Sequence, residues 1–147
     1  MTSGNHPDVS IALQFGDISA SHAIKYSRIE RLVKLILDAE NIKWSHVGVI
    51  FSTHEYVHNL NLSYLDHDYE TDVLSFLIDN TDRGLEGEIY VDVETAIERF
   101  EEFDATLQSE FERYVAHGVL HLAGYRDESE TEKSLMVALE DKYLTQI

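Results

Sequence analysis

The hydrophobic pattern of the chain changes period several times along its first third, and this alternation limits the fold more than any single residue does. Residues 9–15 alternate apolar with polar side chains, as in a half-buried strand, and residues 22–38 repeat apolar side chains at helical spacing. A short β-branched run at 47–51 predicts a second, buried strand. A strand, a helix and another strand in this order are typical of a sheet covered by helices.

The middle of the chain predicts a helix followed by a pair of strands. Ser52 and Glu55 have the spacing of a capping box, which starts a helix that continues through Tyr64. Strands are expected at 72–78 and 88–93. The residues between them, DNTDRGLEG, are rich in turn formers and predict an antiparallel hairpin with a long loop.

Everything after the hairpin is predicted to be helical. Helices are expected near 94–102, 105–122 and 129–144, and Gly124 stands where a glycine commonly ends a helix. Together these elements predict an α/β (α+β) layered sandwich, in which about four strands form a small mixed sheet with five helices on its faces. The length of 147 residues fits a single domain over residues 1–147, with residues 1–8 frayed.

Composition removes several classes of function. The chain has no cysteine, which excludes disulfides, thiolate zinc sites and a cysteine nucleophile. No apolar run approaches the ~20 residues that a membrane helix needs, and the first residues lack the basic and apolar parts of a signal peptide, so we expect a cytoplasmic protein with no membrane partner. A formal net charge of −17, from 11 basic and 28 acidic residues, argues against nonspecific binding to nucleic acid.

The segment HGVLHLAGYRD, residues 117–127, is the sharpest local feature. His117 and His121 are one helical turn apart, so both imidazoles project from the same edge of a helix. Gly124 can end that helix and turn the chain back, which lets Asp127 approach the two histidines. Two neutral nitrogens and one carboxylate oxygen are a three-ligand set for Zn²⁺ with an open fourth position. The alternative is a pair of partly exposed polar histidines without a metal.

The same spacing of two histidines, a glycine and a third ligand occurs in metzincin peptidases. Those enzymes carry a glutamate directly after the first histidine, where it acts as the general base. This chain has Gly118 at that position, and a glycine cannot take a proton from a metal-bound water. A metallopeptidase is therefore the least favoured of the alternatives.

HGVLHLAGYRD closely resembles the HGxLHLxGYDH metal motif of the YbeY family, the bacterial endoribonucleases of rRNA maturation. Three further blocks agree in the family's order, so that the resemblance spans about residues 9–143. These blocks are Leu60-Asn61 with Tyr64 and Asp68, the sequence TDVLSF at 71–76, and Gly87-Glu88-Ile89 with Asp92. The resemblance implies an α/β sandwich with a small mixed sheet and a zincin-like metal helix beside it.

The resemblance also implies a metal site. His117 and His121 would be metal ligands, and the family's third ligand, a histidine, corresponds to Asp127 here. One zinc ion is the implied cofactor. Because two histidines and one carboxylate also suit non-haem Fe(II), another divalent transition metal such as iron or nickel is the alternative.

The implied activity is single-strand-specific, metal-dependent endoribonuclease cleavage in maturation of the 16S rRNA 3′ end and in ribosome biogenesis. The implied partners are rRNA or the small ribosomal subunit, and ribosomal proteins. A non-catalytic ribosome-assembly factor with a structural metal is the alternative from another class. The family's arginine, suited to phosphate, corresponds to Leu65, which cannot bind one. Arg126, beside Asp127, is the candidate catalytic substitute, and a surface ion pair with Glu128 or Glu130 is its alternative.

Two interpretations are open for each of the remaining groups of charged residues. Four cations lie at intervals of three within one expected helix: Lys25, Arg28, Arg31 and Lys34. They are either a solvated face of an acidic protein or a local contact for rRNA or a ribosomal protein. Asp72 and Asp92 stand at strand ends, where we favour a structural role over one beside the metal.

Overall fold

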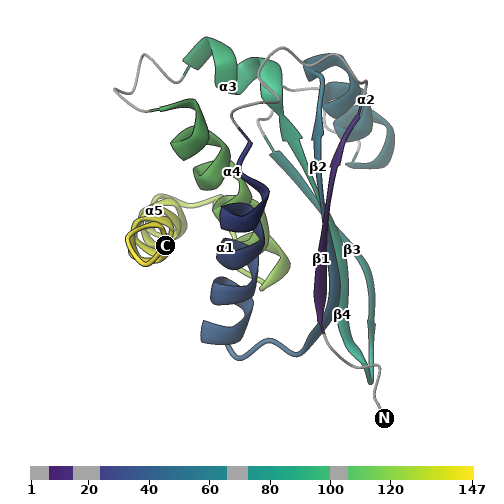
Figure 1. The fold of residues 1–147 in the computed structure, drawn as a ribbon, viewed down its shortest axis with the longest axis vertical. Helices are drawn as coiled ribbons and strands as arrows, with labels where there is room; N and C mark the ends of the chain where they lie inside the picture. Colours follow the sequence, from purple (N-terminus) through teal and green to yellow (C-terminus); the bar gives the residue numbers. More distant parts are fainter. Residues whose placement is uncertain (1–6, 15–23, 66–72, 100–105) are drawn as a thin grey trace.

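The computed structural model describes residues 7–14, 24–65, 73–99 and 106–147 (Figure 1). Strands and helices follow one another in the order β1 (Asp8–Leu13), α1 (Tyr26–Ala39), β2 (Trp44–Ser52), α2 (His54–Leu65), β3 (Val73–Thr81), β4 (Gly84–Asp92), α3 (Val93–Arg99), α4 (Leu107–Leu122) and α5 (Glu130–Leu144). Asp8, expected in the frayed N-terminal segment, is instead the first residue of β1 and pairs with His46. None of the helices in the described ranges is long and apolar enough to cross a membrane.

The four described strands form one mixed sheet in the order β1-β2-β4-β3. β2 is parallel to both β1 and β4, whereas β3 is antiparallel to β4. Figure 1 shows α1, α4 and α5 on one side of this sheet and α2 on the other. On that second face the ring of Tyr56 in α2 lies 6.0 Å from the ring of Tyr90 in β4. The α/β layers, the mixed four-stranded sheet and the five helices are confirmed.

The core lies between the sheet and the layer formed by α1 and α4. Five apolar side chains of α1 are completely buried: Ile29, Leu32, Val33, Ile36 and Leu37. They belong to the same cluster as the inward side chains of β2 and β4, and the ring of Phe51 meets the ring of Phe111 of α4 edge to face at 5.4 Å. Full burial of one such aliphatic side chain stabilises the fold by about 1.5–3 kcal/mol, so these contacts hold α1 and α4 on the sheet.

Two helices begin later than the sequence predicts. α1 starts at Tyr26, because Ile24 is buried and the N–H of Lys25 donates to Oε1 of Gln108 in α4 at 3.0 Å, which holds the chain extended there. α2 starts at His54, and its cap is Thr53, whose Oγ1 accepts from the N–H of Tyr56 at 3.2 Å.

The expected capping residue Ser52 instead ends β2. Its side chain is completely buried, and its hydroxyl donates to Oε1 of Gln14 at 3.1 Å. Ser52 is still part of the strand, with its side chain held against Gln14 just after β1, so the next residue, Thr53, caps the helix. Strand β2 is correspondingly longer than the expected run of 47–51, since it begins at Trp44.

The hairpin between β3 and β4 is antiparallel as predicted, but the long loop is wrong. Thr81 pairs with Gly84, which leaves only Asp82 and Arg83 as a tight turn. Gly84 has φ +109°, and a Cβ there would lie 2.7 Å from backbone atoms of β2 and its preceding residue, so only glycine fits. An irregularity between Leu77 and Asp79 breaks the alternation that marks a strand, which hides this part of β3 from the sequence pattern.

Several expected boundaries lie outside the described residues. These are residue 15 of the strand at 9–15, residues 22–23 of the helix at 22–38, residue 72 of the strand at 72–78, residues 100–102 of the helix at 94–102 and residue 105 of the helix at 105–122. The last expected helix is confirmed as α5, with Ser129 as its cap: its hydroxyl accepts from the N–H of Glu132 at 3.1 Å, and the Glu132 carboxylate accepts from the N–H of Ser129.

A candidate metal centre at the end of helix α4

Helix α4 lies against the sheet through a glycine. A Cβ at Gly118 would lie 2.6 Å from Cγ2 of Ile89 and 3.2 Å from Cγ2 of Val73. The carbonyl of Gly118 also accepts a hydrogen bond from the Ser75 hydroxyl at 2.8 Å. Position 118 therefore faces the sheet and leaves no room for the glutamate that a zincin peptidase needs there, which removes further support from the peptidase alternative.

The two histidines of α4 point to one place. The Nε2 atoms of His117 and His121 lie 3.0 Å apart, and the rings are nearly perpendicular, at 79°. Their side chains are 24% and 30% exposed, so the shared edge is open to solvent. This is the arrangement that the spacing of one helical turn predicts.

The turn after α4 is built on Gly124. Its φ of +106° is left-handed, and its N–H donates to the carbonyl of His121 at 3.0 Å. The next N–H, of Tyr125, donates to the carbonyl of Leu120 at 3.0 Å, which completes a Schellman motif and confirms the predicted glycine cap. The hydroxyl of Tyr125 donates to Oε1 of Glu40, just beyond α1, at 2.6 Å and anchors this turn.

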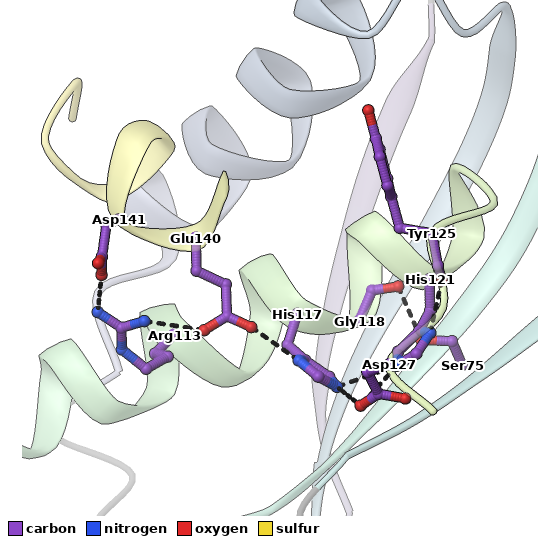
Figure 2. Close-up of polar contacts among 9 residues, drawn as sticks. All are labelled: Ser75, Arg113, His117, Gly118, His121, Tyr125, Asp127, Glu140 and Asp141. Carbon is purple, nitrogen blue, oxygen red and sulfur yellow. Dashed lines mark hydrogen bonds and ion pairs between the residues drawn. The ribbon is translucent and has the colours of Figure 1, made fainter. Parts of the chain in front are cut away.

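The reversed chain brings Asp127 to the two histidines. Its Oδ2 lies 3.2 Å from Nε2 of His117 and 3.6 Å from Nε2 of His121 (Figure 2). A tetrahedral zinc ion with bonds of about 2.0–2.1 Å separates its ligand atoms by about 3.3–3.4 Å. The three separations of 3.0, 3.2 and 3.6 Å lie around that value, so the donors fit a divalent transition metal. No other group of potential ligands in the described part of the chain converges in this way.

The other nitrogen of each ring is held away from this point. Nδ1 of His121 donates to the carbonyl of Tyr125 at 2.9 Å, because a carbonyl can only accept. Nδ1 of His117 lies 2.7 Å from Oε2 of Glu140 in α5. With protons on both Nδ1 atoms, both Nε2 lone pairs face Asp127.

Burial keeps one of these rings neutral. The pKa of His121 is lowered below its usual value of about 6.5, first by burial and second by the charge that His117 can carry. Asp127 opposes this shift but does not reverse it. Because only the neutral imidazole binds a metal, the lowered pKa favours the ligand form near neutral pH.

The structure gives Arg126 an acidic partner on the surface. Its guanidinium pairs with Glu128, and both side chains are well exposed, at 65% and 72%. This is the surface ion pair that was the alternative to a catalytic role, and that role stays a prediction. Leu65 ends α2, but its side chain, like all of Asp68 and Asp72, lies outside what the structure describes.

Asp92 has the structural role that the sequence favoured. It is completely buried and caps α3, because it accepts from the N–H of Thr95 at 2.9 Å and from the Thr95 hydroxyl at 2.6 Å. Its other partner is His54, whose Nδ1 lies 2.5 Å away. Asp92 therefore ties the start of α2 to the end of β4.

Two of the four cations within residues 25–34 already have carboxylate partners. Arg28 forms a two-pronged ion pair with Glu112 of α4, at 2.8 and 3.1 Å, and Lys34 pairs with Glu30 one turn away at 2.8 Å. Lys25 and Arg31 are exposed. This pairing favours the solvated face over a contact for nucleic acid.

Sequence reasoning missed the carboxylate behind His117. Glu140 and its partner Arg113 lie in an ordinary mixture of charged residues, and no local spacing marks them. A search for a buried acidic residue on the face of α5 that meets α4 would have been the available signal, since acidic residues are seldom buried without a partner.

Comparison with known proteins gives a consistent result. A match to the family described as Endoribonuclease YbeY covers residues 14–147. A protein of that name from Salinibacter ruber is 39% identical over 135 residues, which is 86% of each chain, and one from Chloroherpeton thalassium is 30% identical over 80% of this chain and 82% of its own. A solution structure of a Thermotoga maritima protein, 30% identical, covers 92% of this chain and 85% of its own with a TM-score of 0.58. The chain therefore belongs to the Endoribonuclease YbeY family.

Proposed function

We propose that this protein is a metal-dependent endoribonuclease that cleaves single-stranded RNA. The observation that carries the proposal is the convergence of His117, His121 and Asp127 on one solvent-open point in a member of this family. Relatives over most of the chain bear the name Endoribonuclease. An open site with three protein ligands is the arrangement of catalytic rather than structural zinc.

We propose zinc as the metal, with iron or nickel as the alternatives. The separations of the three donor atoms support this choice, as do two neutral nitrogens with one hard oxygen. When bound, the ion supplies Lewis-acid polarisation of a phosphoryl oxygen and a more acidic water. The two histidines hold neutral nitrogens in place through their Nδ1 hydrogen bonds, and Asp127 adds one negative charge that offsets part of the charge of the ion.

We propose rRNA, at the 3′ end of 16S rRNA in the small ribosomal subunit, as the substrate in the cytoplasm, with ribosomal proteins as further partners. A net charge of −17 supports a substrate that is presented locally, because an acidic protein is repelled by RNA in general. Arg126 is the residue that we propose for the phosphate. An exposed pair such as Arg126 with Glu128 is worth only about 0.2–1 kcal/mol, so the guanidinium can exchange it for a phosphate at little cost.

The test is cleavage of a labelled single-stranded RNA that carries the 16S 3′ end, with the same RNA annealed to its complement as the control. We expect wild-type protein to cut the single strand, and chelator or His117→Ala to abolish cutting. The second candidate is the non-catalytic assembly factor, because Leu65 stands where the family has an arginine suited to phosphate. Wild-type protein that holds one metal per chain and binds small subunits but never cuts RNA would favour that candidate.

A further inference from the structure

Behind the metal centre, a chain of charged groups leads from His117 to helix α5 (Figure 2). Oε2 of Glu140 lies 2.7 Å from Nδ1 of His117, and its Oε1 accepts from Nη1 of Arg113 at 2.8 Å. The other guanidinium nitrogen, Nη2, donates to Oδ1 of Asp141 at 2.6 Å. One buried carboxylate thus bridges two residues of α4 that lie one helical turn apart.

The two acidic partners of Arg113 differ in how far they are buried. The side chain of Glu140 is 6% exposed, whereas that of Asp141 is 58% exposed. A buried carboxylate is costly unless cations or donors surround it, and here both of its oxygens are engaged. Asp141 touches the same guanidinium from the solvent side.

The two histidines are supported unequally. His121 is backed by a neutral carbonyl, whereas His117 is backed by a carboxylate that Arg113 holds in place. A carboxylate behind a ligating histidine fixes the ring and its tautomer and makes the facing nitrogen a stronger donor. Removal of such a partner typically weakens metal binding by about 10–100-fold.

We infer that Glu140 is a positioning residue that sets the metal affinity of His117 and couples helix α5 to the metal centre. This inference rests on the proposed metal site. The competing account is that Glu140 and Asp141 serve only to clamp α5 to α4 through Arg113. The two accounts differ in what Asp141 does, because Asp141 shares the clamp but not the histidine.

The experiment compares Glu140→Gln with Asp141→Asn, two variants of equal size that each remove one charge from Arg113. Zinc affinity of the metal-free proteins is measured by competition with a zinc-binding dye, and thermal melting of the metal-free forms is recorded alongside. We expect Glu140→Gln to bind zinc about 10-fold or more weakly and Asp141→Asn to bind as wild type does. Equal affinities for wild type and Glu140→Gln, or equal losses in both variants, would overturn the inference.

A second measurement needs no variant. Because coupling is reciprocal, zinc bound to wild type should slow amide hydrogen exchange in α5, at 130–144, as well as in the ligand segment at 117–127. Protection confined to 117–127 would contradict a link through Glu140. If wild type itself binds no zinc, the proposed metal site fails and this inference falls with it, which is distinguishable from a failure of Glu140 alone.

Discussion

The packing of α4 on the sheet makes a quantitative prediction for Gly118→Ala. The added Cβ would lie 2.6 Å from Cγ2 of Ile89, a completely buried side chain that is stiff about χ1, and 3.1 Å from Oγ of Ser75. Neither neighbour is the free end of a flexible side chain, so the helix has to move. We take the upper end of the usual cost of overpacking, about 3 kcal/mol, as the destabilisation.

The higher helix propensity of alanine offsets part of this destabilisation. Alanine is better than glycine in a helix by about 1 kcal/mol, which leaves a net loss of about 2 kcal/mol in the free energy of unfolding of Gly118→Ala. For a chain of this size that loss lowers the melting temperature by about 4–8 °C. The three proposed ligands lie on α4 and its own terminal turn and move with the helix, so we expect zinc to bind still.

The assay is thermal and urea unfolding of metal-free protein, with Gly48→Ala as the matched control. A Cβ at Gly48 meets its nearest neighbour, Oγ of Ser10, at 3.4 Å, which is an ordinary contact. Because glycine within a strand costs about 0.5–1 kcal/mol relative to alanine, this variant should be as stable as wild type or slightly more stable. Should Gly118→Ala melt at the temperature of Gly48→Ala or above it, the close approach of α4 to the sheet would be refuted.

The remaining predictions concern protons and cations around the site. The pKa of His121 is lowered in the folded protein, so the unfolded chain takes up a proton at higher pH than the folded one does. The metal-free protein should therefore lose stability as pH falls below about 6.5. A free energy of unfolding that stays constant from pH 7 to 5 would contradict this. Arg126→Ala should lower RNA cleavage at unchanged metal content, with partial restoration by Leu65→Arg; cleavage at the wild-type rate would leave Arg126 a surface ion pair. Because the pairing of Arg28 and Lys34 with carboxylates favours a solvated face, the double variant Lys25→Gln/Arg31→Gln should leave RNA association and its salt dependence as in wild type, and weaker association with a flatter salt dependence would show that these cations contact RNA.

How much of the fold the sequence predicts depends on how clearly one side of an element is buried. Five apolar side chains of α1, Leu32 and Ile36 among them, are completely buried along one face, so their helical period is easy to recognise. The outer part of β3 has no buried side: Leu77 and Ile78 are both exposed, at 57% and 52%. Asp79, Asn80 and Thr81 at the end of β3 are exposed as well, so there is no alternation to detect, and this outer part of the hairpin is predicted as a loop.

In the candidate site, the contacts between residues near one another in the sequence could be predicted, and the contact between distant residues could not. His117, His121 and Asp127 come close to one another because of one helical turn and one glycine turn. Both turns lie within eleven consecutive residues, 117–127. Glu140 approaches His117 from 23 residues away, on another helix. That contact depends on how α5 packs against α4, and no local pattern in the sequence specifies it.

The most direct test of the account joins metal content to cleavage in one protein preparation. Wild type and His117→Ala/His121→Ala are purified without added metal, analysed for metals, and incubated with single-stranded RNA carrying the 16S 3′ end. The account predicts about one zinc per wild-type chain and cleavage that chelator abolishes and zinc restores, with neither metal nor cleavage in the double variant. Equal metal content in the two proteins, or equal cleavage by both, would contradict it.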